Sequence, residues 1–140
     1  MTELKRVLPI LLLAPILMAM GGFTELPADK VPATKRDYSV VYVDQMDVIT
    51  ECKQASIEGN TFIEGKRGEG SMAIDFEKIK SVAFRIKGND LIALIKLRDG
   101  SETVLVVAKD KKAYGRTKFG AFQIRLADLK TMILSSSPKR

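Results

Sequence analysis

The chain contains a series of short runs in which apolar and polar residues alternate, and many of the apolar residues are β-branched. This pattern is typical of β-strands that bury one face. It predicts strands at residues 39–44, 48–57, 71–76, 81–86, 91–97, 103–108 and 121–126. Turn-forming residues separate several of these runs, at 58–60, 88–90 and 98–101, and Asp99-Gly100 is the clearest hairpin signal. We therefore predict an all-β, antiparallel fold, either a small sandwich or a barrel.

Residues 65–84 and 115–134 are similar to each other without a gap, at a constant offset of 50 residues. Two glycine pairs coincide, Gly65 with Gly115 and Gly70 with Gly120, and seven apolar positions coincide as well. Such a pattern indicates two copies of one supersecondary unit, at about 38–86 and 89–134. We interpret the four glycines as structural turn residues. The alternative is a coincidence between two amphipathic patterns.

Each copy contains an alternating run, then a charged four-residue step at 77–80 or 127–130, then the start of a further strand. We expect the side chains of Ile79 and Leu129 to point from these steps into the core. Apolar residues here also recur at helical spacing, for example Met72, Phe76 and Ile79, so a helix over the steps is an alternative. A single helical turn at each step would satisfy both patterns. Neither copy is large enough to bury a sheet alone, so we predict one domain over 37–135.

The N-terminus has the organisation of a secretory signal peptide. Lys5 and Arg6 precede an uncharged apolar run at 8–20. As a helix that run would be only about 20 Å long, short of the roughly 30 Å needed to span a bilayer, so a permanent anchor is the less favoured reading. We predict a signal peptide at 1–21, with a later cleavage site after Ala28, and no stable membrane span afterwards.

The segments that flank the predicted domain have no apolar period. Residues 22–36 are rich in Pro, Ala, Thr and charge and are predicted to be a flexible leader, and 136–140 a disordered tail. The predicted location is periplasmic or secreted.

The amino-acid composition excludes several classes of catalytic and binding site. The 140-residue chain has no histidine, which excludes Ser-His-Asp and Cys-His catalysis and ordinary zinc sites. It has no tryptophan and few aromatic residues, which disfavours carbohydrate and single-strand nucleic-acid grooves. The single cysteine, Cys52, cannot form an intramolecular disulfide, and we interpret it as a buried apolar filler. No metal or cofactor site is predicted.

Glycine-rich residues 65–71 resemble a phosphate loop only in spacing. The lysine that would follow the last glycine is absent, since Ser71 stands there, and the dinucleotide-like spacing at 68–73 lacks a strand-and-helix context. Carboxylates are the remaining catalytic candidates, Asp75 and Glu77, but the second copy has Arg125 and Ala127 in their places. We favour a solvated strand face for them.

The formal net charge is +6, and basic residues are concentrated between positions 109 and 118. The predicted basic patch comprises Lys109, Lys111, Lys112, Arg116 and Lys118, with Asp110 as the one acidic residue among them. In an exported protein such a patch suits an envelope protein, an anionic polymer or a lipid headgroup better than nucleic acid. The alternative is a hairpin that only keeps the protein soluble.

These observations predict a non-catalytic accessory or binding protein of the bacterial envelope, which recognises another envelope component through a sheet edge or the basic hairpin. One alternative is a hydrolase of glycans that uses Asp75 or Glu77. Another is a structural subunit of an exported assembly. The sequence leaves the oligomeric state open.

Overall fold

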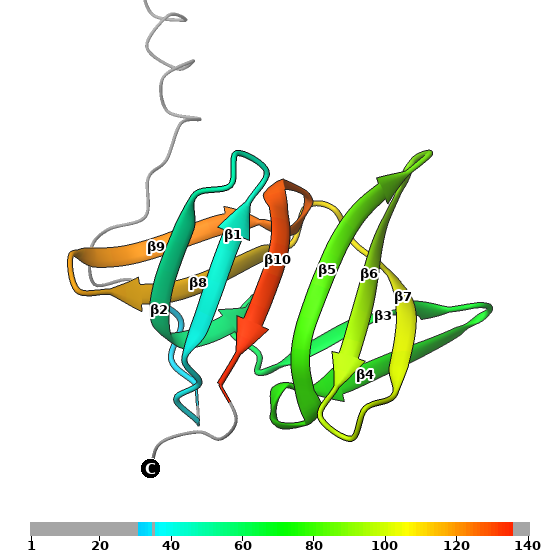
Figure 1. Ribbon diagram of the computed structural model, residues 1–140, viewed down its shortest axis with the longest axis horizontal. Helices are drawn as coiled ribbons and strands as arrows, with labels where there is room; N and C mark the ends of the chain where they lie inside the picture. The colour runs from blue at the N-terminus through cyan, green and yellow to red at the C-terminus, as the bar shows by residue number, and fades with distance from the viewer. Residues whose placement is uncertain (1–30, 35, 136–140) are drawn as a thin grey trace, which may run out of the picture.

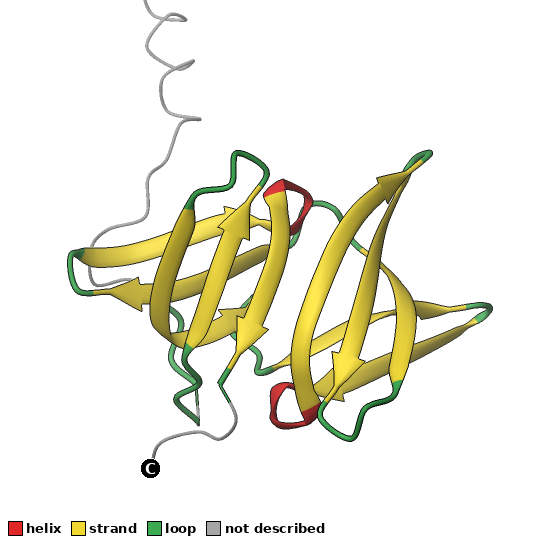
Figure 2. Ribbon diagram, in the orientation of Figure 1, coloured by secondary structure: helices red, strands yellow, loops and turns green. Residues whose placement is uncertain are grey.

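The computed structural model describes residues 31–34 and 36–135, and this part of the chain is all-β (Figures 1 and 2). The predicted signal peptide, most of the leader and the tail lie outside the described residues. The strands within the described part are β1 Val40–Asp44, β2 Ile49–Ile57, β3 Phe62–Arg67, β4 Gly70–Asp75, β5 Ile79–Lys87, β6 Asp90–Leu97, β7 Glu102–Val107, β8 Lys112–Thr117, β9 Gly120–Arg125 and β10 Leu129–Leu134.

The alternating runs predict their strands correctly, and Asp99-Gly100 does join a hairpin, β6 to β7. The two charged steps form single 3₁₀ turns, η2 Phe76–Lys78 and η3 Leu126–Asp128, each followed at once by a strand. A single turn thus accommodates both patterns in the steps, and the longer helix is excluded there. Strand β10 is the further strand expected after the second step. Two strands, β3 and β8, were not predicted.

All ten strands of the described chain belong to one antiparallel sheet, in the order β4-β3-β7-β6-β5-β10-β1-β2-β8-β9. Figure 1 shows that its two ends curl: hairpin β3–β4 crosses behind β5, β6 and β7, and hairpin β8–β9 crosses behind β10, β1 and β2. The result is a curled half-barrel sheet rather than two separate sheets. The core lies inside the two curls, where side chains from the crossing layers meet.

The two halves of the sheet are interlocked. One half contains β3, β4 and β5 from the first part of the chain with β6 and β7 from the second, and the other half combines β1 and β2 with β8, β9 and β10. The halves join at the centre, where β5 pairs with β10 and Val82 lies opposite Met132. Neither half is built from residues 38–86 or 89–134 alone, although strands β3 to β7 follow one another along the chain and are inserted between β2 and β8.

The ladders of the two halves correspond position by position. Strands β3 and β8, strands β4 and β9, and turns η2 and η3 have bounds that differ by 50 residues. Strands β5 and β10 also begin 50 residues apart, but β6 and β7 differ from β1 and β2 by 53, because Ala83 faces Leu94 on β6 whereas Ile133 faces Val41 on β1. We call two positions equivalent when they hold the same place in the ladders of the two halves.

Buried side chains fill both curls. The fully buried set includes Tyr42 and Ile95, Phe76 and Leu126, Ile79 and Leu129, and Val82 and Met132, each of which is an equivalent pair. The ring of Tyr38 meets that of Phe76 edge-on at 5.6 Å, which ties the segment before β1 to the opposite half. Ile79 and Leu129 are fully buried, as expected for core residues at the steps.

Gly65 and Gly115 do not lie in turns, which corrects the prediction: they stand within β3 and β8. A Cβ on Gly65 would lie 2.7 Å from the carbonyl oxygen of Val106, and one on Gly115 would lie 2.5 Å from Cβ of Cys52. Both glycines are therefore required by the close approach of a neighbouring strand. Gly70 and Gly120 open β4 and β9 immediately after the hairpin turns.

Candidate functional site

A groove of about 830 Å³ lies on the half of the described chain that contains β1 and β2. It runs over β10, β1 and β2 and is bounded by the turn between β8 and β9. Its lining includes Val41, Ile49, Lys53, Lys118, Phe119 and Ile133. This volume is within the range of sites that bind small molecules or parts of larger ligands.

The floor is the outward face of the central strands. Val41 lies between Ile133 on β10 and Glu51 on β2, while its chain neighbours Val40 and Tyr42 point into the core. Because side chains alternate along a strand, this register turns Ile133 and Ile49 away from the core as well. They remain 45% and 65% exposed. The floor is thus apolar surface that the fold itself does not cover.

One wall is the hairpin turn of Lys118 and Phe119. The Thr117 hydroxyl oxygen accepts hydrogen bonds from the backbone N–H groups of Phe119 at 3.0 Å and Gly120 at 3.1 Å, which fixes the turn. The Phe119 ring is 89% exposed, and Lys118 Nζ lies 5.7 Å from its centroid. A large apolar ring is therefore presented beside a cation on a well-held turn.

Positive charge gathers on the β8 side of the groove. Lys53 on β2 pairs in register with Arg116 on β8, and Lys118 follows in the turn. The acidic side chains in the lining are Glu51 and Asp37, and Asp37 Oδ1 accepts a hydrogen bond from the backbone N–H of Gln54 at 2.8 Å. The β8 side therefore favours an anionic group, next to the apolar floor.

The five residues of the predicted basic patch do not form one cluster. Lys109 and Lys111 precede β8 and Lys112 begins it, whereas Arg116 and Lys118 lie at its far end. Lys112 and Arg116 are four positions apart along an extended strand, which is about 13 Å.

Lys111 and Lys112, at the start of β8, also have acidic neighbours. Lys111 Nζ lies 3.7 Å from Glu64 Oε1, and the Lys112 backbone N–H donates to Glu58 Oε2 at 2.8 Å. Only Arg116 and Lys118 of the predicted five line the groove.

The sequence pattern did not single out Lys53, Ile49, Ile133 or Phe119. Lys53 is 63 residues before Arg116, and only the β2–β8 pairing brings them together. One signal was available: Phe119 is a large apolar residue in a hairpin turn, where polar or small residues are usual.

The two carboxylates proposed as alternative catalytic groups lie away from the groove. Asp75 is exposed at the end of β4, and Glu77 is exposed in η2. Glu77 Oε1 is 2.5 Å from a terminal guanidinium nitrogen (Nη1) of Arg36. Both groups therefore stand in a solvated setting, with Glu77 engaged in a surface ion pair.

Other chemistry-bearing groups in the described chain are few. Cys52 is buried, and burial raises the pKa of its thiol to about 11. No group of three or more His, Cys, Asp or Glu residues in the described chain is arranged to hold a metal ion. Over the same residues no helix has the length and apolar character to cross a membrane.

Comparison with known proteins places the chain in a family but gives no function. Neither the curated proteins nor the solved structures contain a match to the chain. The chain matches a protein family described as "Uncharacterised protein" over residues 34–137, which spans all ten described strands. Because this match covers well over half of the chain, the protein belongs to that family.

Proposed function

We propose that the protein is a non-catalytic binding protein of the bacterial envelope, exported to the periplasm or beyond, which recognises an anionic envelope component in the groove. The signal-peptide pattern supports export. The groove supports binding, because it joins uncovered apolar surface to a cationic wall. The observation that carries the proposal is the placement of Ile49, Phe119 and Ile133 beside Lys53 and Lys118.

The equivalent positions in the other half provide an internal comparison. Phe119 and Lys118 correspond to Glu69 and Gly68 in the turn between β3 and β4. Ile49 corresponds to Glu102, which faces Lys96 as Ile49 faces Val43. The same ladder therefore forms with polar or small residues at these places. The scaffold does not require the apolar and basic side chains of the groove, which favours a role in recognition.

We also propose that the chain arose by internal duplication. The equal spacing of the glycines, the matching bounds of β3 with β8 and β4 with β9, and the sheet order support this. Exchanging each strand for its equivalent reverses the sheet order and leaves it otherwise unchanged. A duplicated scaffold would leave one half free to acquire the groove residues.

Titration with a soluble polyanion tests the binding proposal. The probe is heparin, and the variants are Lys53→Gln with Lys118→Gln in one protein and Lys87→Gln with Lys109→Gln in a control of equal net charge. We expect the groove variant to raise the dissociation constant about tenfold and the control to change it less than about twofold, since the control lysines are outside the groove.

Salt provides a second readout in the same titration. Binding to the unaltered protein should weaken as salt is added, because exposed charges are screened. Equal losses in the two double variants would show that net charge alone drives binding. The proposal would then lose its support.

A further inference from the structure

Large apolar side chains are exposed on two turns of the half that contains the groove. Phe119 on the β8–β9 turn is 89% exposed, and Met46 on the β1–β2 turn is 82% exposed. Val48 and Ile49 follow after Asp47, and both are more than half exposed. Most of the large exposed hydrophobic side chains in the described chain belong to this one region, together with Ile133. Such a concentration marks an interaction surface.

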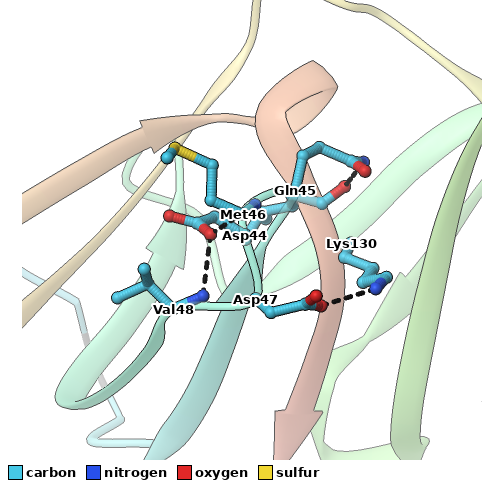
Figure 3. A network of polar contacts seen from close by, with 7 residues as sticks. Asp44, Gln45, Met46, Asp47, Val48 and Lys130 are labelled. Atoms are coloured by element: carbon cyan, nitrogen blue, oxygen red, sulfur yellow. Dashed lines mark hydrogen bonds and ion pairs between the residues drawn. The ribbon is translucent and has the colours of Figure 1, made fainter.

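The β1–β2 turn is held by polar contacts that leave Met46 uncovered (Figure 3). Asp44 Oδ1 accepts hydrogen bonds from the backbone N–H groups of Met46 at 2.8 Å and Val48 at 3.0 Å. Asp47 Oδ1 lies 2.5 Å from Lys130 Nζ. Figure 3 shows the Met46 side chain directed away from Lys130. The turn is fixed before any partner arrives, which lowers the entropic cost of binding through it.

The corresponding turns of the other half lack these side chains. The β6–β7 turn consists of residues 98–101, Arg98, Asp99, Gly100 and Ser101, and the β3–β4 turn of Gly68 and Glu69. The Asp44 backbone N–H donates to the Val48 carbonyl oxygen, as the equivalent Leu97 N–H donates to that of Ser101. The backbones of these two turns are therefore held alike, and of the corresponding turns only β1–β2 and β8–β9 carry large exposed apolar side chains.

We propose that this end docks on the surface of an anionic bilayer, with Phe119 and Met46 entering the interfacial region and Lys53 and Lys118 meeting the headgroups. This inference rests on the proposed function and specifies its anionic component. Apolar side chains with neighbouring lysines are the features of interfacial binding, in which apolar burial and attraction to anionic lipid add together.

The arrangement of the exposed Phe119 and Met46 side chains favours a lipid surface over a folded protein partner. Phe119 and Met46 stand on separate turns, and the groove lies beside them. A protein would need a matched pocket for each tip, whereas a fluid interface accepts protruding side chains without one. The net charge, +6 for the whole chain and +5 without residues 1–21 (21 Lys and Arg against 16 Asp and Glu), also favours an anionic surface.

The absence of tryptophan from the chain makes a clean reporter possible. Phe119→Trp places the sole tryptophan at the proposed contact, and Glu69→Trp places it on the equivalent turn as a matched control. Both are made in a chain that begins at residue 22, which keeps every described residue and removes the apolar run at 8–20. The probes are vesicles of phosphatidylcholine alone and of phosphatidylcholine mixed with phosphatidylglycerol.

We expect emission of Phe119→Trp to shift to the blue with the anionic vesicles and to be quenched by lipids brominated in their acyl chains. Emission of Glu69→Trp should not change. In the chain that begins at residue 22 and carries no tryptophan, Met46→Ser should reduce partitioning to these vesicles about tenfold, whereas Ile86→Ser, a similar loss on an exposed part of β5, should leave it within about twofold.

Unchanged emission of Phe119→Trp, or equal shifts at positions 119 and 69, would overturn the membrane inference. If heparin still binds in a manner that depends on Lys53 and Lys118, the proposed function stands and the bilayer is wrong. If neither probe binds, both proposals fail. Quenching confined to Phe119→Trp and lost on addition of salt would establish the anionic bilayer as the ligand.

Discussion

Gly115 and Gly65 are the residues whose size the fold restricts most directly. On the Gly115→Ala variant, the new methyl group would lie 2.5 Å from Cβ and 2.8 Å from Sγ of Cys52, a clash that requires the strands to move apart. We expect the free energy of unfolding to fall by about 2 kcal/mol, as for other overpacked sites. Urea denaturation measures this change.

Gly70→Ala is the matched control, because the nearest atom to a Cβ there is 3.8 Å away, at the Arg67 carbonyl oxygen. Its stability should remain within about 0.5 kcal/mol of the unaltered protein. Equal effects at positions 70 and 115 would contradict the close-approach explanation.

The buried thiol of Cys52 predicts that the native state loses stability at alkaline pH. Burial raises the pKa of its thiol to about 11, above the value of about 9 for an exposed thiol. The unfolded chain therefore loses this proton at a lower pH than the native chain, and native stability falls as pH rises from about 9 to about 11. Two pKa units correspond to roughly 2–3 kcal/mol.

Urea midpoints measured across this pH range check the prediction. Cys52→Ala serves as the control, since other groups also titrate there, and the difference between the two proteins isolates the thiol. A constant difference from pH 8 to pH 11 would mean that the Cys52 thiol is not desolvated in the native state.

At the scale of single elements, runs of apolar and β-branched residues bounded by turn signals were sufficient to locate strands such as β6 and β7. It failed for β3 and β8. Their sequences, FIEGKR and KAYGRT, contain a glycine in the middle and basic residues near the end, which weakens the period-2 pattern. Each strand pairs locally in a hairpin, and a neighbouring strand packs against its glycine, a long-range contact that no local pattern records.

Strand β2 contains a bulge that the sequence also did not reveal. Its register with β8 shifts between Lys53 and Ser56, and Gln54 has a φ of 55°, in the left-handed region. The backbone N–H of Gln54 donates to Asp37 Oδ1, which stabilises the irregular conformation. The bulge is an extra feature of this half of the sheet and lies at the end of the groove.

Substitution at Gln54 tests the bulge. Gln54→Val should lower stability by about 1–2 kcal/mol, because a β-branched residue is strongly disfavoured at this φ. Gln54→Gly should be more stable than Gln54→Val by at least about 1 kcal/mol. Thermal unfolding followed by circular dichroism measures both, and a valine variant as stable as the original would rule out the left-handed conformation.

At the scale of the whole molecule, the interlocked halves predict cooperative unfolding. Each half takes strands from both parts of the chain, so residues 22–88 or 89–140 alone lack the partners of their own strands. We expect neither fragment to fold as a monomer. Mixing them in equal amounts should restore the β-sheet signal in circular dichroism, with one thermal transition. Two monomeric fragments that each unfold cooperatively would contradict the interlocked sheet.

The candidate site was less accessible to prediction than the fold. The basic run at 109–118 located Arg116 and Lys118, but it also included Lys111 and Lys112, which have acidic neighbours elsewhere. Lys53, Ile49 and Ile133 come from strands whose adjacency depends on the sheet order β10-β1-β2-β8. The surface is assembled from distant segments, and its position follows from tertiary pairing alone.

Backbone amide chemical shifts test the central claim, that an anionic component is recognised at the groove, most directly. The titrant is a short-chain phosphatidylglycerol, added to the chain that begins at residue 22. We predict that the largest shifts occur at Lys53, Lys118 and Phe119, with little change at the equivalent positions Val106 and Glu69. Shifts of similar size at both sets of positions, or shifts confined to the β3–β4 hairpin, would contradict the account.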